Sequence, residues 1–161
     1  MATPQKITPF FWFDGNAEEA ASLYVSLFKD SRILSVSRYG DAGPGPKGKA
    51  MSVEFELAGL RFLALNGGPQ FKFTEATSLL VNCESQEEVD ALWSRLTADG
   101  GKEGQCGWLK DKFGLSWQIV PSRFFQLMQD KDPQRSQRVM QAMLQMKKFD
   151  IARLEEASRS P

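Results

Sequence analysis

The sequence has no histidine and only two cysteines, Cys83 and Cys106, among its 161 residues. Histidine is the commonest transition-metal ligand and the commonest general base, so its absence argues against the chemistry that most often uses it. Two cysteines without close spacing are typical of reduced thiols in the cytosol rather than of a disulfide framework. We therefore predict a cytoplasmic protein without a cofactor.

An excess of charge and a long apolar run are also missing. Lysine plus arginine and aspartate plus glutamate both total 20, so no net field would attract nucleic acid or an anionic membrane. No apolar stretch is long enough to span a bilayer, and the first residues, MATPQKITPF, do not resemble a signal peptide. A small molecule is therefore the expected partner, with no role for nucleic acid or a membrane.

The stretch Gly104–Pro121 predicts a β-hairpin with strands Gln105–Lys110 and Leu115–Val120 around a four-residue turn. Its return strand, GLSWQIV from Gly114, matches GLRFLAL at Gly59–Leu65. Likewise NAEEAASLY from Asn16 matches SQEEVDALW from Ser85, at an offset of 69 (85 − 16). Such matches also arise by chance, but here their order recurs as well, which favours an internal repeat.

The repeat predicts an α+β fold of two βαβββ modules followed by C-terminal helices. Each module has a helix that starts at a capping box, formed by Asn16 with Glu19 and by Ser85 with Glu88. The strands are expected at Ile7–Phe13, Ile33–Tyr39, Met51–Leu57, Leu60–Asn66 and Thr77–Cys83, and in the hairpin. We place the modules at residues 1–75 and 76–121 and the helical extension at 122–161.

The extension is expected to hold three helices, with Asp132 and Asp150 as caps of the last two. Its methionines form an adaptable packing surface. They are expected to bury against the modules or a second copy of the chain; the alternative is a peptide-binding groove.

Paired βαβββ modules with a DxFGxxW strand resemble the vicinal oxygen chelate superfamily, which includes glyoxalase I, bleomycin-resistance proteins and extradiol dioxygenases. Within it, the chain is most similar to the PhnB-like branch, whose members are often labelled demethylubiquinone methyltransferases. The segments that carry this resemblance are Pro9–Tyr24, Phe62–Phe73, Glu103–Pro121 and Val139–Ala157. The resemblance implies a homodimer and a ligand cavity on the concave face of each module, with the helix on the convex face.

The resemblance also implies one divalent metal, held by the first and last strands of each module. Those positions correspond here to Pro9, Leu63, Ser78 and Gln118, which include no thiolate, imidazole or carboxylate. Such a set cannot hold a transition metal tightly. Methyl transfer would need a nucleotide-like cofactor site, and no Gly-rich strand-to-helix turn of that type is present.

Strand alternation then assigns side chains to the cavity. If Gln118 faces it, Ser116 and Val120 do too, while Trp117 and Ile119 lie under the helix. The four-residue turn would pair Leu109 with Ser116, and Trp108 with Trp117 in the core. Cys106, on the same side, is expected to be a small buried hydrophobe, with a nucleophile as the alternative.

The first hairpin, with a two-residue turn at Ala58-Gly59, pairs Glu56 with Arg61 as an ion pair and Glu54 with Leu63. Glu54 is then the candidate acid or base, although these charges could instead line a wet rim. Phe11, Phe13 and Leu80 are expected as apolar wall, and Asn66 to Phe73 as the mouth. The candidate ligand-binding residues are Phe11, Phe13, Glu56, Arg61, Leu63, Asn66, Ser78, Leu80, Ser116 and Gln118.

The function predicted from the sequence is metal-independent binding of a small molecule. One alternative is an enzyme, an isomerase, lyase or oxygenase, that uses Glu54. Another is a module whose dimer surface is itself the function.

Overall fold

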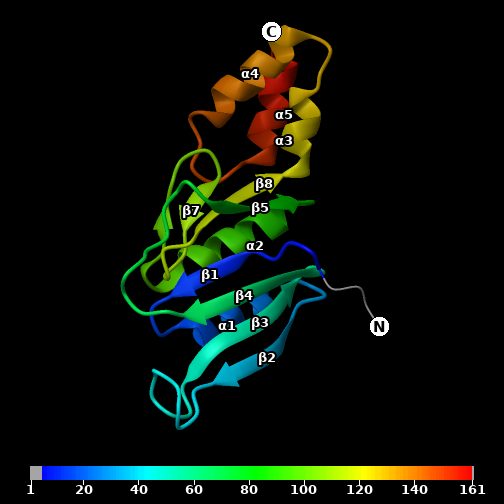
Figure 1. The fold of residues 1–161 in the computed structure, drawn as a ribbon. Coiled ribbons are helices and arrows are strands. Elements are labelled where there is room, and N and C mark those ends of the chain that lie inside the picture. The colour runs from blue at the N-terminus through cyan, green and yellow to red at the C-terminus, as the bar shows by residue number, and fades with distance from the viewer. Residues whose placement is uncertain (1–4, 161) are drawn as a thin grey trace. The chain divides into compact units, whose positions relative to one another are not determined.

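The computed structural model describes residues 5–160, which form two compact units, one ending at Lys72 and the other beginning at Phe73. Each unit contains the predicted βαβββ arrangement, and the second also contains the C-terminal helices (Figure 1). The α+β fold of two modules is thus confirmed. The three-part division at 75/76 and 121/122 stays a prediction.

The first unit has a four-stranded sheet in the order β1-β4-β3-β2 with one helix against it. Its elements are β1 (Phe10–Phe13), α1 (Ala17–Leu27), β2 (Arg32–Arg38), β3 (Ala50–Leu57) and β4 (Leu60–Asn66). The first and last strands of the unit, β1 and β4, run parallel, whereas the other pairs are antiparallel. The first strand is shorter than predicted, because it starts at Phe10, and Ile7 is 81% exposed.

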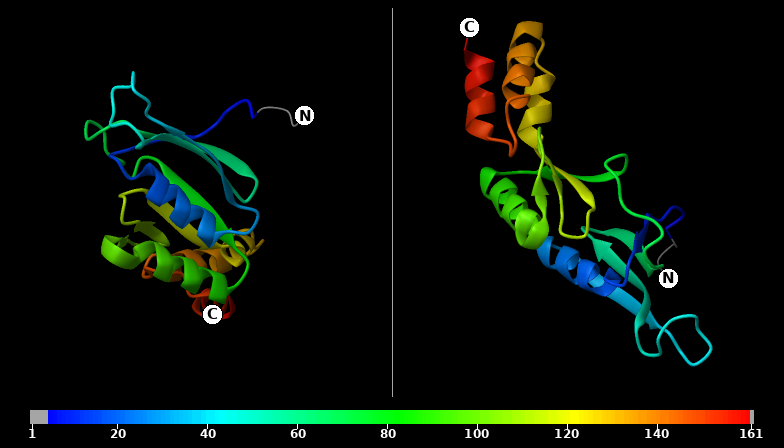
Figure 2. Two further views of the ribbon diagram at one scale, coloured as in Figure 1. Left: turned by 90° about the horizontal axis from the view of Figure 1, so that it is seen from below. Right: turned by 90° about the vertical axis from the view of Figure 1, so that its left-hand side faces the viewer.

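The core of the first unit lies between α1 and the sheet. The buried stripe of α1 consists of small residues and Tyr24, which allows the helix to approach the strands closely. Phe11, Phe62 and Phe55 stack in a row beneath it, with ring centroids 5.5 and 5.3 Å apart. Tyr24 contacts Phe55 at the end of this row. Figure 2 shows α1 lying along one face of the sheet.

The second unit repeats the same topology in the order β5-β8-β7-β6. Its elements are β5 (Ser78–Cys83), α2 (Gln86–Thr97), a short 3-10 turn (Ala98–Gly100), β6 (Lys102–Glu103), β7 (Trp108–Lys110) and β8 (Ser116–Pro121). Its α2 buries Val89, Leu92, Trp93 and Leu96. The predicted first strand of the hairpin is broken: only its last three residues form β7.

The predicted Ser85 cap of α2 is confirmed, although Glu88 binds the N–H of Glu84 and not that of Ser85, and the predicted Asn16 cap of α1 is wrong. Ser85 Oγ accepts a hydrogen bond from Glu88 N (3.2 Å), and Glu88 Oε2 accepts one from Glu84 N (2.8 Å). The Asn16 side chain makes no cap hydrogen bond. Instead Asn66, at the end of β4, accepts from Ala17 N at 2.9 Å and donates to Ala50 O at 3.0 Å. A residue 49 positions away in sequence therefore caps α1.

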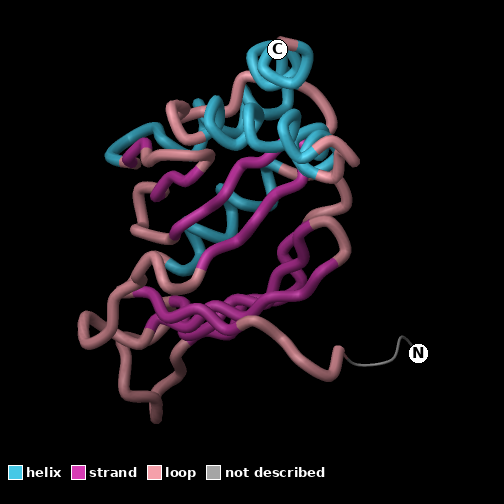
Figure 3. Tube along the Cα trace, turned by 90° about the horizontal axis from the view of Figure 1, so that it is seen from above, coloured by secondary structure: helices cyan, strands magenta, loops and turns pink. Residues whose placement is uncertain are grey.

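Three helices form the extension: α3 (Ser122–Met128), α4 (Pro133–Met143) and α5 (Ile151–Arg159). They lie together near the C-terminus in Figure 3 and bury one hydrophobic cluster. Asp132 and Asp150 cap α4 and α5 as predicted. The cluster consists of Val120, Phe124, Leu127, Val139, Met146, Phe149 and Leu154, with Met128 and Met143 packed against it.

The segment between α4 and α5 ties the extension to the second module. Cys106 N and Gly107 N donate to Met146 O and Lys147 O, both at 2.8 Å. The Gln86 amide donates to Phe149 O and accepts from Ile151 N, both at 2.9 Å. These contacts satisfy backbone groups of the linking segment, so the extension is part of the second unit.

Candidate functional site

Each sheet has a front face, by which we mean the face turned away from α1 or α2. On the first front face, Glu54 lies opposite Leu63 and Glu56 lies opposite Arg61, as the two-residue turn predicted. Phe10 pairs with Leu63 across the parallel β1–β4 ladder and is 57% exposed. The first front face therefore combines apolar side chains with a small cluster of charges.

The ion pair on the first front face is not the predicted one. Arg61 Nη1 contacts Glu54 Oε1 at 3.4 Å, along the diagonal of the β3–β4 ladder. Ser35 Oγ, on β2, also lies 3.5 Å from Glu54 Oε2. Long side chains reach diagonal neighbours as readily as direct ones, which the pairing register alone does not reveal. Glu54 thus has a cationic partner, and its side chain is 34% exposed.

The prediction that Phe11 and Phe13 line the cavity is wrong. Both are buried, at 6% and 3% exposure, and lie with Phe62 on the α1 side of the sheet. The cause is one extra residue: three residues, 14–16, separate β1 from α1, whereas two, 84–85, separate β5 from α2. The offset of 69 therefore holds for the helices but becomes 70 (80 − 10) for the first strands. Phe10 is thus the structural counterpart of Leu80.

The mouth predicted at Asn66 to Phe73 also differs in its details. Asn66 uses its side chain to cap α1. The residues after it fold against Trp12, whose indole Nε1 donates to Gly68 O at 2.9 Å and whose ring meets Phe71 edge-on at 4.9 Å. Trp12, which the sequence reasoning did not select, therefore borders the first front face together with Phe10.

The second front face carries the polar positions of the second module. Ser78 lies opposite Ser116, and Leu80 lies opposite Gln118. Gln118 Nε2 donates to Ser78 Oγ at 2.9 Å. Ser116 is 1% exposed, and its Oγ has no hydrogen-bond partner among the described residues. A buried hydroxyl without a partner is costly, so this face has unused hydrogen-bonding capacity.

The register of the second hairpin is shifted by one residue from the predicted one. Trp108 pairs with Gln118, and Leu109 pairs with Trp117. Asp111 causes the shift, because its carboxylate accepts from Phe113 N (2.9 Å) and Leu115 N (3.1 Å) and so includes Leu115 in a five-residue turn. Trp108 therefore lies on the second front face, not in the core.

Different contacts are made at the two ends of the second front face. Val120, expected in the cavity, is buried in the cluster of the extension instead. On β7, Lys110 forms an ion pair with Glu75. The hydrogen bond from Lys110 lowers the pKa of the Glu75 carboxyl below its ordinary value.

Cys83 does not lie at a nucleophilic site on this geometry, whereas the two readings of Cys106 stay predictions. Burial raises the pKa of the Cys83 thiol to about 12, so at neutral pH it is a thiol rather than a reactive thiolate. Cys106 is half-buried in a turn with a φ of 57°, and its backbone binds the extension.

The fold implies a metal, but the residues at the corresponding positions do not fit one. With the corrected register, the corresponding positions, which we call corner positions, are Phe10 and Leu63 in the first module and Leu80 or Ser78 and Gln118 in the second. Phenylalanine and leucine cannot coordinate, and the serine and glutamine are neutral and hydrogen-bonded to each other. Elsewhere among residues 5–160, no three His, Cys, Asp or Glu side chains are grouped to hold a metal ion. In the same range, no helix is long and apolar enough to cross a bilayer.

Comparison with known proteins supports the fold. Residues 5–120 match the family model of 3-demethylubiquinone-9 3-methyltransferase. The PhnB protein from Bacillus cereus, provisionally described by the same name, is 40% identical to this chain. The match covers 73% of this chain and 100% of that protein, with a TM-score of 0.69. No curated protein gives a significant match.

Two more distant structures share the fold. A protein from Pseudomonas aeruginosa is 23% identical, with 73% of this chain covering 98% of it and a TM-score of 0.60. The fosfomycin resistance protein FosX from Listeria monocytogenes, in complex with Mn(II) and sulfate, is 15% identical, with 73% of this chain covering 92% of it and a TM-score of 0.50. The family match ends at residue 120, before α3 begins. The chain therefore belongs to the 3-demethylubiquinone-9 3-methyltransferase family, the family whose name also describes the PhnB protein from Bacillus cereus.

Proposed function

We propose that the protein binds a small, largely apolar organic molecule on its front faces without a transition metal. The observation that carries this proposal is the chemistry of the corner positions, where Phe10, Leu63 and Leu80 are apolar and Gln118 is a neutral polar group. Binding sites for small molecules combine apolar walls with a few placed polar groups. The Gln118–Ser78 pair on the second front face supplies such polar groups.

Methyl transfer, which the family name describes, is less well supported by this chain. Nucleotide-type cofactors bind at glycine-rich turns between a strand and a helix. The two such turns of the described modules, residues 14–16 and 84–85, contain a single glycine, Gly15. We therefore favour binding over methyl transfer.

A thermal-shift screen of small organic molecules in EDTA tests the proposal. A ligand at 100 times its Kd should stabilise the native state by about 2.7 kcal/mol and raise Tm accordingly. Binding of each hit, measured by calorimetry, should weaken at least tenfold in Gln118→Ala. Leu144→Ala, a change at an exposed residue of the extension, should bind as the wild type does. Hits that appear only when the screen is repeated with a divalent metal in place of EDTA, or that bind Gln118→Ala unchanged, would contradict the proposal.

The alternative function is an enzyme in which Glu54 acts as acid or base. It is favoured by the Glu54–Arg61 ion pair, which holds a carboxylate in a defined place on the first front face. The same titrations in Glu54→Gln separate the two functions. Retained binding with loss of turnover of the hit would support the enzyme, whereas retained binding without any turnover in the wild type would support the binding protein.

We further propose that the protein is a homodimer. Phe10, 57% exposed, and Leu80, 43% exposed, are large apolar side chains on the two front faces, and association would remove them from water. Light scattering coupled to size-exclusion chromatography should give a mass near twice the 18.1 kDa of one chain. The double variant Phe10→Ser, Leu80→Ser should shift the mass toward the monomer. A wild-type mass equal to that of a single chain at high concentration would contradict the dimer.

A further inference from the structure

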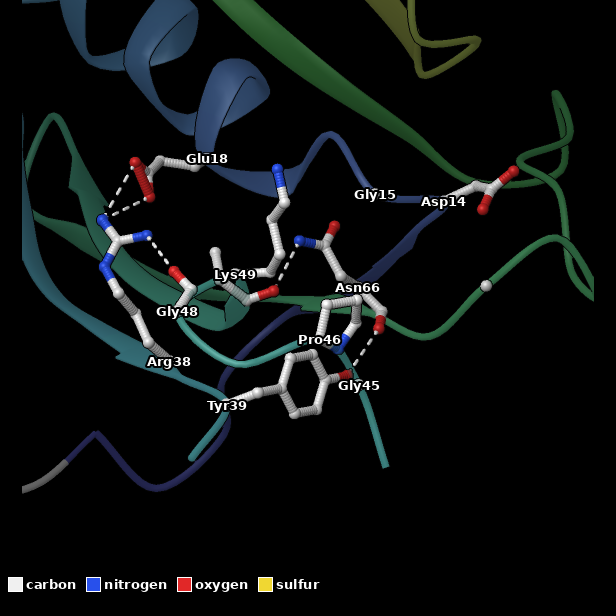
Figure 4. Close-up of a pocket in the computed structure, with 12 residues that line it drawn as sticks. Asp14, Gly15, Glu18, Arg38, Tyr39, Gly45, Pro46, Gly48, Lys49 and Asn66 are labelled. Atoms are coloured by element: carbon white, nitrogen blue, oxygen red, sulfur yellow. Dashed lines mark hydrogen bonds and ion pairs between the residues drawn. The ribbon is translucent and has the colours of Figure 1, made fainter. Parts of the chain in front are cut away.

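A hollow lies within the first unit, at the end of its sheet rather than on its front face. It has a volume of about 650 Å³, within the range of pockets that hold small molecules. Its walls come from the loop between β2 and β3, the start of α1 and the end of β4 (Figure 4). Of the predicted ligand-binding residues and the predicted mouth, only Asn66 and Gly68 line it, so this hollow is distinct from the front faces.

The β2–β3 loop that forms one wall is fixed in place by Tyr39. Tyr39 N donates to Lys49 O, and Gly48 N donates to Tyr39 O, both at 2.9 Å, which joins the two ends of the loop. The ring then packs against Gly45 so closely that a Cβ there would lie 2.3 Å from Tyr39 Cε2. The Tyr39 hydroxyl reaches Asn66 O at 3.4 Å. The hollow is therefore shaped before any ligand arrives.

The charged side chains that line the hollow are two acids, Asp14 and Glu18, and two bases, Arg38 and Lys49. Arg38 and Glu18 engage each other, with Arg38 Nη2 lying 3.0 and 3.2 Å from the two carboxylate oxygens. Within the part of the chain that the structure describes, the Lys49 ammonium has no hydrogen-bond or ion-pair partner. Figure 4 shows Lys49 extending toward the start of α1 between Glu18 and Gly15, whereas the Asp14 carboxylate points away.

The backbone N–H of Ala17, at the start of α1, is not free to bind a ligand in the hollow, because it already donates a hydrogen bond to the Asn66 side chain. Among the described residues, the charges of the lining without an ion-pair partner are then the exposed Lys49 ammonium and the Asp14 carboxylate, and only the ammonium extends toward the start of α1. An anion of small volume would complete this arrangement through a charge-assisted hydrogen bond to Lys49.

We propose that this hollow binds a small oxyanion, a carboxylate or phosphate group, with the Lys49 ammonium as its charged contact and the Tyr39-supported loop as its wall. Nothing lies within 4 Å of a Cβ added at Gly48, so a compact anionic group can approach the loop backbone at that position.

Calorimetric titration of the full chain at constant ionic strength tests this proposal, with inorganic phosphate in one arm and succinate in the other. We expect saturable one-site binding of at least one probe, and the arm that saturates identifies the kind of oxyanion. Lys49→Gln should weaken that binding at least tenfold. Lys47→Gln is the matched control, since Lys47 is on the same loop, pairs with Asp41 at 2.9 Å and lies outside the lining.

Gly45→Ala provides a second variant that removes no charge. It should also weaken binding, because the added Cβ would push the loop away from Tyr39. No saturable binding of either probe, or equal weakening by Lys49→Gln and Lys47→Gln, would overturn the proposal.

Discussion

Replacing Asp111 with alanine should lower the free energy of unfolding by roughly 3 kcal/mol or more, because hydrogen bonds to a buried charged group are strong and their donors would lose their acceptor. Asp111 is 2% exposed. One of its oxygens accepts from Phe113 N and Leu115 N, and the other accepts from Trp117 Nε1 at 2.9 Å. Without the carboxylate, three donors in and beside the β7–β8 turn would be left unpaired. Urea unfolding followed by tryptophan fluorescence measures the loss.

Asp132→Ala is the matched control for this prediction. Asp132 also accepts from a backbone N–H two residues ahead, Gln134 N at 2.9 Å, but its side chain is half-exposed. Loss of such a helix cap costs about 1 kcal/mol. Equal destabilisation by the two variants would show that Asp111 contributes no more than an ordinary exposed cap.

Replacing Gly107 with alanine should destabilise the second unit by about 3 kcal/mol, the sum of overpacking and of left-handed backbone strain. Gly107 has a φ of +83°, and an added Cβ would lie 2.4 Å from the Phe149 ring and 3.0 Å from Ile119 O. Neither neighbour can move freely, because Phe149 packs in the hydrophobic cluster of the extension and Ile119 N donates a hydrogen bond to Gly107 O at 2.8 Å. Thermal and urea unfolding both measure the effect.

Gly114→Ala, in the same hairpin, separates the two causes. Gly114 has a similar φ of +89°, but nothing lies within 4 Å of its added Cβ. The free energy of unfolding should then fall only by the cost of the backbone strain, about 1–2 kcal/mol. If Gly107→Ala cost no more than Gly114→Ala, the close packing of Phe149 on this turn would be refuted.

The elements with local signals were predictable from the sequence. The side chains that cap α2, α4 and α5 (Ser85, Asp132 and Asp150) lie within a few residues of the groups they bind, and all three caps are confirmed. The first hairpin was also predictable, because a two-residue turn at Ala58-Gly59 permits one pairing register.

Features that depend on long-range contacts or loop length were not predictable in the same way. The cap of α1 comes from Asn66, which no local pattern connects with Ala17. The turn at Asp111 was assigned four residues because its side-chain hydrogen bond to Leu115 N cannot be read from the turn composition. In both modules the error changed which side chains share a face, since one residue reverses the alternation of a strand.

The candidate site was predicted in part for the same reason. The positions of Glu54, Leu63, Ser78, Leu80, Ser116 and Gln118 on the front faces follow from alternation within confirmed ladders. Phe11 and Phe13 were misplaced by the single extra residue before α1, and Phe10 was missed with them. The longer loop, DGN against ES, was visible in the sequence and could have signalled the change of offset.

The unequal loops before α1 and α2 mean that the duplicated halves have no single period. Phe10 corresponds to Leu80 in the opening strands, whereas Ala17 corresponds to Gln86 at the start of the helices, which is one position less of separation. Anyone building chimaeras by exchanging segments between the halves should therefore join them inside a helix. A junction placed inside an opening strand with the helix offset of 69 would shift that strand by one residue. The shift would exchange its two faces, so that phenylalanine rings face solvent and polar side chains face the core.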